Sequence, residues 1–219
     1  MFTLHFFYMN HQQTLTKIEQ GRVIAILRGD FAGREASIVE ALISGGITAV
    51  EVTMNSPNAL QKIAQLAQQF ISRCAIGAGT VLTCEEVQQV AGAGGTFIVS
   101  PNCDVAVIKE ARRLGLASFP GCFTPTEVVQ AMQAGADAAK LFPANSLGPG
   151  YVKALRAPLN DVKLIPTGGV TPENAVEYLD AGAWAVGIGS ELTSKEILAD
   201  TTFEKLRARA AEFSEAMKS

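Results

Sequence analysis

The sequence predicts an α/β fold: a single (β/α)8 TIM barrel preceded by an N-terminal helix. Short apolar segments alternate with amphipathic ones, and eight apolar segments recur at intervals of roughly 20–25 residues, as β/α units do. Most of these segments are apolar at successive positions, which is typical of parallel strands buried on both faces. A chain of 219 residues suits one well-filled domain of this kind. An open doubly wound sheet is the alternative fold.

The expected elements follow from these patterns in chain order. A helix over about residues 16–20 precedes the first strand and is expected to cover the lower end of the barrel. A last helix over 201–217 carries an apolar stripe, which indicates packing on the barrel. No segment resembles an interdomain linker, so we expect an N-terminal extension at 1–10, flexible in solution, and one barrel domain at 11–219. The strands are expected at 23–27, 49–52, 74–77, 96–99, 117–119, 138–142, 162–165 and 185–188.

Helix boundaries carry their own signals. Ser56-Pro57, Thr124-Pro125 and Thr171-Pro172 each place an N-cap hydroxyl before a first-turn proline. Glu86 and Glu127 follow threonines at the spacing of a capping box, in which side chain and backbone satisfy each other. Helix ends are expected at glycines in left-handed geometry, namely Gly45, Gly46, Gly92, Gly115, Gly135 and Gly182.

Composition narrows the class of function. With 48% hydrophobic and 18% charged residues, the chain is typical of a globular protein with a large core. A net charge of -3 gives no reason to expect nucleic acid or an anionic membrane as a partner. The sequence contains no run of eighteen apolar residues, so it predicts no membrane span. The four cysteines lack metal or redox spacing, which favours reduced packing residues in a cytoplasmic protein: Cys74, Cys84, Cys103 and Cys122.

The N-terminal segment lacks the features of a secretory signal, namely a basic start and a small-residue cleavage site. We expect Met9 to be the natural start and residues 1–8 to be an upstream extension. His5 and His11 lie in this segment, which is expected to be unstructured, so no histidine is expected inside the barrel. Acidic residues are not clustered at metal-binding spacing either. We therefore expect no metal and no cofactor.

Lys140 is the most informative residue, because it lies inside the apolar segment 138–143. An ammonium group is costly to bury, so such a lysine has a partner, a lowered pKa or a covalent role. Glu51 lies in a similar apolar setting about ninety residues earlier. A neutral lysine attacks carbonyl carbons and a carboxyl group shuttles protons, so the two residues predict Schiff-base chemistry. A structural ion pair is the simpler alternative.

Further candidates follow other strands, at the end of the barrel where active sites lie. Arg28 ends the first strand, and its guanidinium suits a carboxylate, although a surface ion pair is an alternative. Gly168-Gly169 and Gly189-Ser190 follow the last two strands, where barrel enzymes often bind phosphate. Each glycine pair taken alone would indicate only a tight turn. Thr80 and Ser100 follow the third and fourth strands.

The chain resembles the KDPG and KHG aldolases (2-keto-3-deoxy-6-phosphogluconate and 4-hydroxy-2-oxoglutarate aldolases), including the 6-phosphogalactonate branch. The resemblance implies a homotrimeric barrel with class I chemistry, Lys140 as the Schiff-base lysine and Glu51 as the general acid/base. It places Arg28, Thr80 and Pro101 around pyruvate and its carboxylate. The matching segments are 24–28, 51–53, 77–81, 98–101, 120–121, 140–143, 166–169 and 187–190.

One position departs from the family pattern. Many KDPG aldolases carry an arginine four residues after the catalytic glutamate, where this chain has Asn55. Arg28 and segment 147–153 resemble the phosphogalactonate branch, which implies that the carboxylate-binding arginine is moved rather than lost. The implied reaction cleaves a phosphorylated keto acid to pyruvate and glyceraldehyde 3-phosphate. The sequence does not choose among phosphogluconate, phosphogalactonate and hydroxyoxoglutarate acids.

Two other classes of function compete with the aldolase. A sugar-phosphate epimerase or isomerase would share the phosphate-binding loops and could use a buried lysine as acid or base. A barrel that only binds a phosphorylated metabolite, or serves as an oligomerising scaffold, would also fit those loops.

Overall fold

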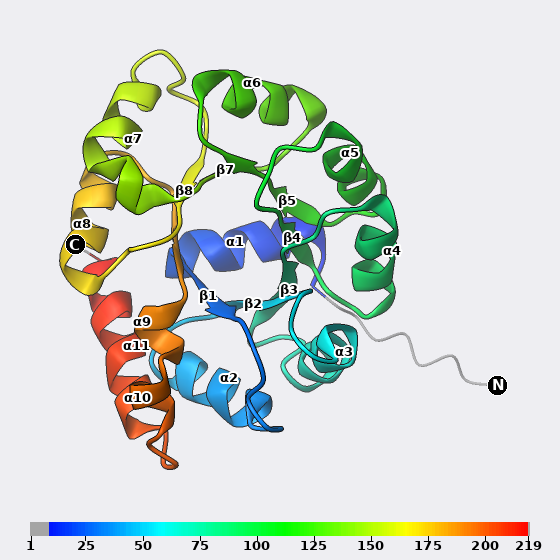
Figure 1. Cartoon of the computed structure of the whole chain (residues 1–219), viewed down its shortest axis with the longest axis vertical. Helices are drawn as coiled ribbons and strands as arrows, with labels where there is room; N and C mark the ends of the chain where they lie inside the picture. Colours follow the sequence, from blue (N-terminus) through cyan, green and yellow to red (C-terminus); the bar gives the residue numbers. More distant parts are fainter. Residues whose placement is uncertain (1–8, 219) are drawn as a thin grey trace.

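The computed structural model describes residues 9–218 as a ring of short parallel strands surrounded by helices (Figure 1). The (β/α)8 barrel predicted from the sequence is confirmed. Residues 1–8 of the predicted extension, His5 among them, lie outside the described residues. No helix in the described part of the chain is long and apolar enough to cross a membrane.

Eight of the nine strands in the described residues fall on the predicted segments. The other, at 121–122, lies beyond the predicted fifth segment 117–119 and is separated from it by Pro120, which has no N–H to donate to a strand ladder. The strands are β1 Val23–Leu27, β2 Ala49–Thr53, β3 Ala75–Gly79, β4 Phe97–Val99, β5 Ala117–Phe119, β6 Gly121–Cys122, β7 Ala139–Leu141, β8 Leu164–Pro166 and β9 Val186–Ile188.

The strands form two parallel sheets whose edges meet. One sheet has the order β5-β4-β3-β2-β1-β9 and the other the order β6-β7-β8. The Asp137 N–H, just before β7, donates to the Ser118 carbonyl of β5 at 3.1 Å, which joins the two sheets on one side. A parallel bridge between Thr167 and Gly187 joins them on the other side. The ring therefore closes, unlike the open sheet that was the alternative.

The helices lie outside the ring, apart from α1, which lies across one end of it (Figure 1). Their bounds are α1 His11–Gly21, α2 Glu35–Ser44, α3 Ala59–Gln69, α4 Cys84–Gly92, α5 Val105–Arg113, α6 Pro125–Ala134, α7 Gly148–Arg156, α8 Pro172–Asp180, α9 Ser190–Thr193, α10 Lys195–Leu198 and α11 Glu204–Ala216, with a 3-10 turn η1 at Ala144–Ser146.

Most of the predicted helix ends are confirmed. Both predicted capping boxes form, at the starts of α4 and α6, and Thr171 caps α8 as expected. Ser56 is not an N-cap, because α3 begins after Asn58 and the Ser56 hydroxyl accepts a hydrogen bond from the Gly29 N–H. Gly46, Gly115, Gly135 and Gly182 have positive φ, whereas Gly45 and Gly92 do not, and Gly94 has the left-handed φ after α4.

The lower end of the barrel is filled by apolar side chains. Leu15 and Ile18 of α1 pack on inward-facing residues of the strands, including Phe97, Phe119 and Ile165. The helix α1 covers this end as predicted, and it is longer than the predicted segment. His11, which was expected to be unstructured, is the first residue of α1, and its Nε2 lies 2.8 Å from Asp137 Oδ1.

A second apolar layer separates the strands from the outer helices. Leu206, Ala210 and Phe213 of α11 are buried in this layer, and Phe203 packs against it. The last helix therefore packs on the barrel, as its apolar stripe predicted.

Candidate active site

Lys140 and Glu51 both point into the barrel. Side chains alternate along a strand, so residues two apart share a face. Ala138 and Ala49 belong to the interior apolar cluster. Lys140 and Glu51 follow them by two positions and so face the same interior, closer to the carboxyl ends of β7 and β2. Because β5 and β6 share one position in the eight-strand ring, β7 is the sixth strand position and β2 the second. The two side chains therefore approach from opposite walls.

Burial governs the charges of this pair, because Lys140 is only 5% and Glu51 only 2% exposed. Desolvation raises the pKa of Glu51, although the positive charges of Lys140 and Arg28 oppose the change. Desolvation also lowers the pKa of Lys140; Glu51 opposes this shift and Arg28 adds to it. Both shifts favour the neutral forms, an amine that can attack and a carboxyl group that can hold a proton.

Lys140 is not paired as a structural core lysine would be. Its ammonium nitrogen makes no ion pair with a carboxylate of residues 9–218, and it lies 4.8 Å from the centre of the Phe142 ring. The sequence alternative of a simple ion pair with Glu51 therefore lacks the contact that it requires.

Gly79 makes room for the Glu51 carboxylate. A Cβ atom at Gly79 would lie 2.3 Å from Glu51 Oε1, which no side chain can occupy. Sequence reasoning missed this role. The sequence did contain a signal for it. Gly77 and Gly79 occupy successive inward-facing positions of β3, opposite larger residues of β2.

A cavity of about 390 Å³ opens beside Lys140 at the carboxyl ends of the strands. Six of the predicted site residues line it, together with Phe142 and Thr167, which belong to the matching segments but were not predicted as site residues. Those six are Arg28, Lys140, Gly168, Gly169, Gly189 and Ser190. The structure thus brings together the lysine, the arginine and both glycine loops.

Thr80 and Pro101 do not line this cavity. Thr80 follows β3 in left-handed geometry, with φ 58°, and is half-buried. The Pro101 carbonyl packs against Gly121, where a Cβ would lie 2.3 Å from its oxygen. Ser100 donates to the Val81 carbonyl at 2.7 Å, so its hydroxyl is used within the frame of the barrel. The predicted contact of Thr80 and Pro101 with pyruvate stays a prediction.

The loop that carries Arg28 is attached to the strand that carries Glu51. The Gly29 N–H donates to Ser56 Oγ at 2.9 Å, and Ser56 Oγ lies 2.9 Å from Thr53 Oγ1 at the end of β2. Asn55, which occupies the family's arginine position, is exposed. This buried hydroxyl pair holds the ends of β1 and β2 together, and with them the two charged residues.

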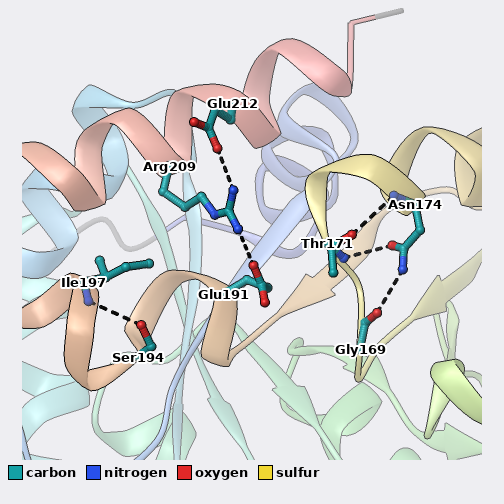
Figure 2. Close-up of polar contacts among 8 residues, drawn as sticks. All are labelled: Gly169, Thr171, Asn174, Glu191, Ser194, Ile197, Arg209 and Glu212. Atoms are coloured by element: carbon teal, nitrogen blue, oxygen red, sulfur yellow. Dashed lines mark hydrogen bonds and ion pairs between the residues drawn. The ribbon is translucent and has the colours of Figure 1, made fainter.

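The glycine loop after β8 meets the cavity in left-handed backbone geometry. Gly168 and Gly169 have φ values of 95° and 73°, a region that residues with a Cβ rarely adopt. Glu191 also lines the cavity, and Arg209 of α11 pairs with its carboxylate from behind while bonding Glu212 at 2.8 Å (Figure 2). The arginine thereby offsets a negative charge beside the loops.

No group of three or more His, Cys, Asp or Glu side chains in residues 9–218 is arranged to hold a metal ion. The four cysteines are free thiols, and burial raises the pKa of Cys74 to about 12. The prediction that they are reduced in the cell stays a prediction.

Comparison with known proteins identifies relatives over most of the chain. The family model described as "KDPG and KHG aldolase" matches residues 15–208. The 2-dehydro-3-deoxy-6-phosphogalactonate aldolase of Escherichia coli K12 is 41% identical over 197 residues, covering 90% of this chain and 94% of the relative. The 2-dehydro-3-deoxy-phosphogluconate aldolase of Treponema pallidum is 35% identical, covering 77% of this chain and 84% of the relative.

Solved structures agree with these matches. The structure described as "Native KDPGal structure" has a TM-score of 0.84 at 41% identity, covering 90% of this chain and 94% of that chain. A KDPG aldolase from Legionella pneumophila, described with pyruvate captured as a covalent carbinolamine intermediate, has a TM-score of 0.81 at 27% identity, covering 90% and 96%.

Proposed function

The chain belongs to the KDPG and KHG aldolase family, and we propose that it is a class I aldolase acting on a 2-keto-3-deoxy-6-phospho sugar acid. The products are pyruvate and glyceraldehyde 3-phosphate. The observation that carries the proposal is Lys140, a buried lysine that lines the cavity and has no carboxylate partner among residues 9–218, with Glu51 buried on the opposite wall of the barrel. This arrangement suits an amine that forms a covalent bond with substrate.

The reaction begins when the neutral amine of Lys140 attacks the C2 ketone of the substrate and water is lost to give an iminium. Glu51, acting through a water molecule, takes the proton from the C4 hydroxyl. The C3–C4 bond breaks, and its electron pair is delocalised into the iminium to form an enamine. Glyceraldehyde 3-phosphate leaves, C3 of the enamine is protonated, and hydrolysis releases pyruvate and the free lysine.

The pKa shifts favour these steps. The lowered pKa of Lys140 increases the fraction of neutral amine near neutral pH. The raised pKa of Glu51 brings the carboxyl group closer to the working pH, where proton transfer in both directions is efficient. The iminium itself accepts the electron pair, so the proposed chemistry needs neither a metal nor a cofactor.

We assign substrate binding to residues at the carboxyl ends of the strands, most of which line the cavity, whereas Thr80 and Pro101 lie outside its lining. We propose that Arg28, Thr80 and Pro101 bind the pyruvate portion, with Arg28 holding the carboxylate. Gly168, Gly169, Gly189 and Ser190 are proposed to bind the phosphate through backbone N–H groups and the Ser190 hydroxyl. Identities of 41% and 43% to two phosphogalactonate aldolases, one of them named as probable, against 35% to a phosphogluconate aldolase, support the phosphogalactonate acid as the first substrate to test.

Two measurements test the proposal. A coupled pyruvate-release assay on the two C4 epimers of the phosphorylated acid, with 4-hydroxy-2-oxoglutarate as a third substrate, identifies the preferred one. Borohydride reduction in the presence of pyruvate should leave a stable adduct on Lys140 and none in Lys140→Met. Absence of the adduct, together with an active Lys140→Met variant, would refute the aldolase and favour an epimerase or isomerase.

We further propose that the enzyme is a cytoplasmic homotrimer. The trimer is supported by the family, and sedimentation of the purified protein tests it. A cytoplasmic location is supported by the proposed substrate, since a phosphorylated acid does not cross a bilayer unaided. The proposed start at Met9 is tested by mass spectrometry of the native chain, in which an intact Met1 would refute it.

A further inference from the structure

The loop between β8 and α8 is held from behind by one side chain, Asn174. Its Oδ1 accepts from the Thr171 N–H at 2.9 Å and its Nδ2 donates to the Gly169 carbonyl at 3.0 Å (Figure 2). The first bond belongs to the capping box of α8 and requires only an acceptor. The second requires a donor, which the glutamates at the corresponding positions of α4 and α6 do not have when ionised.

This second bond sets the direction of a backbone amide. In a trans peptide the carbonyl and the following N–H point in opposite directions. Asn174 holds the Gly169 carbonyl, and the Asn145 N–H holds the Gly168 carbonyl at 3.0 Å. The N–H groups of Val170 and Gly169 are therefore aimed away from these two asparagines.

These two N–H groups are available for a ligand. Gly169 and Val170 line the cavity, and their N–H groups donate to no group of residues 9–218. Val170 is only 3% exposed, and a buried N–H without a partner is costly. Successive backbone N–H groups of this kind form a concavity that suits an anion.

The loop needs such a brace because its glycines leave the backbone free to rotate. A larger residue cannot replace Gly169, since a Cβ there would lie 2.6 Å from Asn145 Cβ and φ is 73°. Rigidity must therefore come from contacts made by other residues, and Asn174 supplies one at the carbonyl that controls the Val170 amide.

We propose that Asn174 is a positioning residue that keeps the Gly169 and Val170 amides aimed at the substrate phosphate. The inference rests on the proposed function and deepens it. Asn174 is not among the residues that line the cavity, so it acts through the loop rather than through contact with substrate. Its loss weakens the binding of phosphorylated ligands and leaves the chemistry of pyruvate at Lys140 unchanged.

Two variants separate the bonds of Asn174. Asn174→Asp keeps the acceptor for Thr171 and loses the donor to Gly169, whereas Asn174→Ala loses both. Both should raise KM for the phosphorylated acid, and KI for glyceraldehyde 3-phosphate, by about five- to tenfold, the value of one hydrogen bond. The rate of borohydride trapping with pyruvate, which carries no phosphate, should stay within about twofold of wild type.

Controls distinguish loss of the Asn174 donor from an added charge and from misfolding. If the new charge in Asn174→Asp acted by repulsion, its effect on KM would decrease as salt is added, because salt screens charge. Loss of the donor does not depend on salt, so we expect the KM ratio of Asn174→Asp to wild type to stay the same from low to high ionic strength. Glu86→Gln changes the same position of the α4 capping box and should alter neither constant. The thermal unfolding midpoint of each variant shows that the protein is folded.

The inference is wrong if both Asn174 variants keep the wild-type KM and KI. It is also wrong if pyruvate trapping weakens as much as the binding of the phosphorylated ligands, because the effect would then be a general distortion. A wild-type protein that traps no pyruvate and cleaves neither epimer would refute the proposed function itself, and this inference with it.

Discussion

The interior of the barrel has two levels built from the same strands. At the lower level Phe97, Phe119 and Ile165 pack together on α1, with the rings of Phe97 and Phe119 5.7 Å apart. At the upper level, nearer the carboxyl ends, Lys140 faces the cavity, the Glu51 carboxylate is buried against Gly79, and glycines replace large side chains. A shift of two residues along a strand separates close apolar packing from buried charge.

The difference separates stability from chemistry. Close packing below stabilises the ring through burial of apolar surface. The upper level leaves two ionisable groups desolvated, which costs stability and shifts both pKa values toward the neutral forms. The following substitutions test whether the two levels are independent in this way.

The largest change in activity is expected at the upper level, for Glu51→Gln. Loss of the proposed general base should lower kcat/KM for cleavage by about 10²- to 10⁴-fold. In wild type, kcat/KM should fall as the pH drops through the raised pKa of Glu51, above the ordinary carboxyl range, because the base must be ionised. If the Glu51→Gln variant still showed this fall of kcat/KM at low pH, the titrating group would be another residue.

The largest change in stability is expected at the lower level, for Phe119→Ala. The lost contacts and the cavity should reduce the free energy of unfolding by about 3–5 kcal/mol, measured by urea denaturation. At a temperature where the variant is folded, kcat should remain close to wild type. A variant that loses kcat in proportion to stability would show that the two levels are coupled.

Arg28→Ala should have a smaller effect, on binding rather than on folding. Loss of a charged hydrogen-bond donor should raise KM for pyruvate-containing ligands by about 10- to 100-fold. Asn55→Ala, which changes an exposed residue on the adjoining loop, should raise it far less. Equal effects of the two variants would place the carboxylate elsewhere.

The smallest effect is a gain in stability when both buried charges are removed. The double variant Lys140→Met, Glu51→Gln should have a free energy of unfolding about 1–2 kcal/mol higher than wild type, because replacement of buried charges is often stabilising. The raised pKa of Glu51 costs stability as pH rises through the ordinary carboxyl range. The lowered pKa of Lys140 costs stability as pH falls below the ordinary amine range. The gain should therefore be largest near neutral pH, and a loss of stability there would contradict it.

Features that depend on one segment could be predicted from the sequence. The apolar segments matched the strands, and Lys140 and Glu51 were found because a charge inside an apolar run is visible without a structure. The glycines after β8 and β9 could be placed at the site because strand order determines where their loops lie.

Features that depend on a distant partner could not be predicted. Ser56-Pro57 has the local pattern of a helix start, but the hydroxyl is used by Gly29 on another strand. Gly79 looks like any glycine until the Glu51 carboxylate is seen against it. Asn174 has an ordinary capping position, and its second bond, to Gly169, appears only in three dimensions.

The helix α1 has a consequence for the order of events during turnover. Leu15 and Ile18 of α1 fill the lower end of the barrel, so ligands reach Lys140 from the cavity side. In the proposed binding mode, with the keto-acid end at the lysine and the phosphate at the outer loops, the aldehyde fragment lies between the bound three-carbon unit and solvent. We therefore expect this fragment to depart first and pyruvate last, and pyruvate to bind first when the enzyme runs in the direction of condensation.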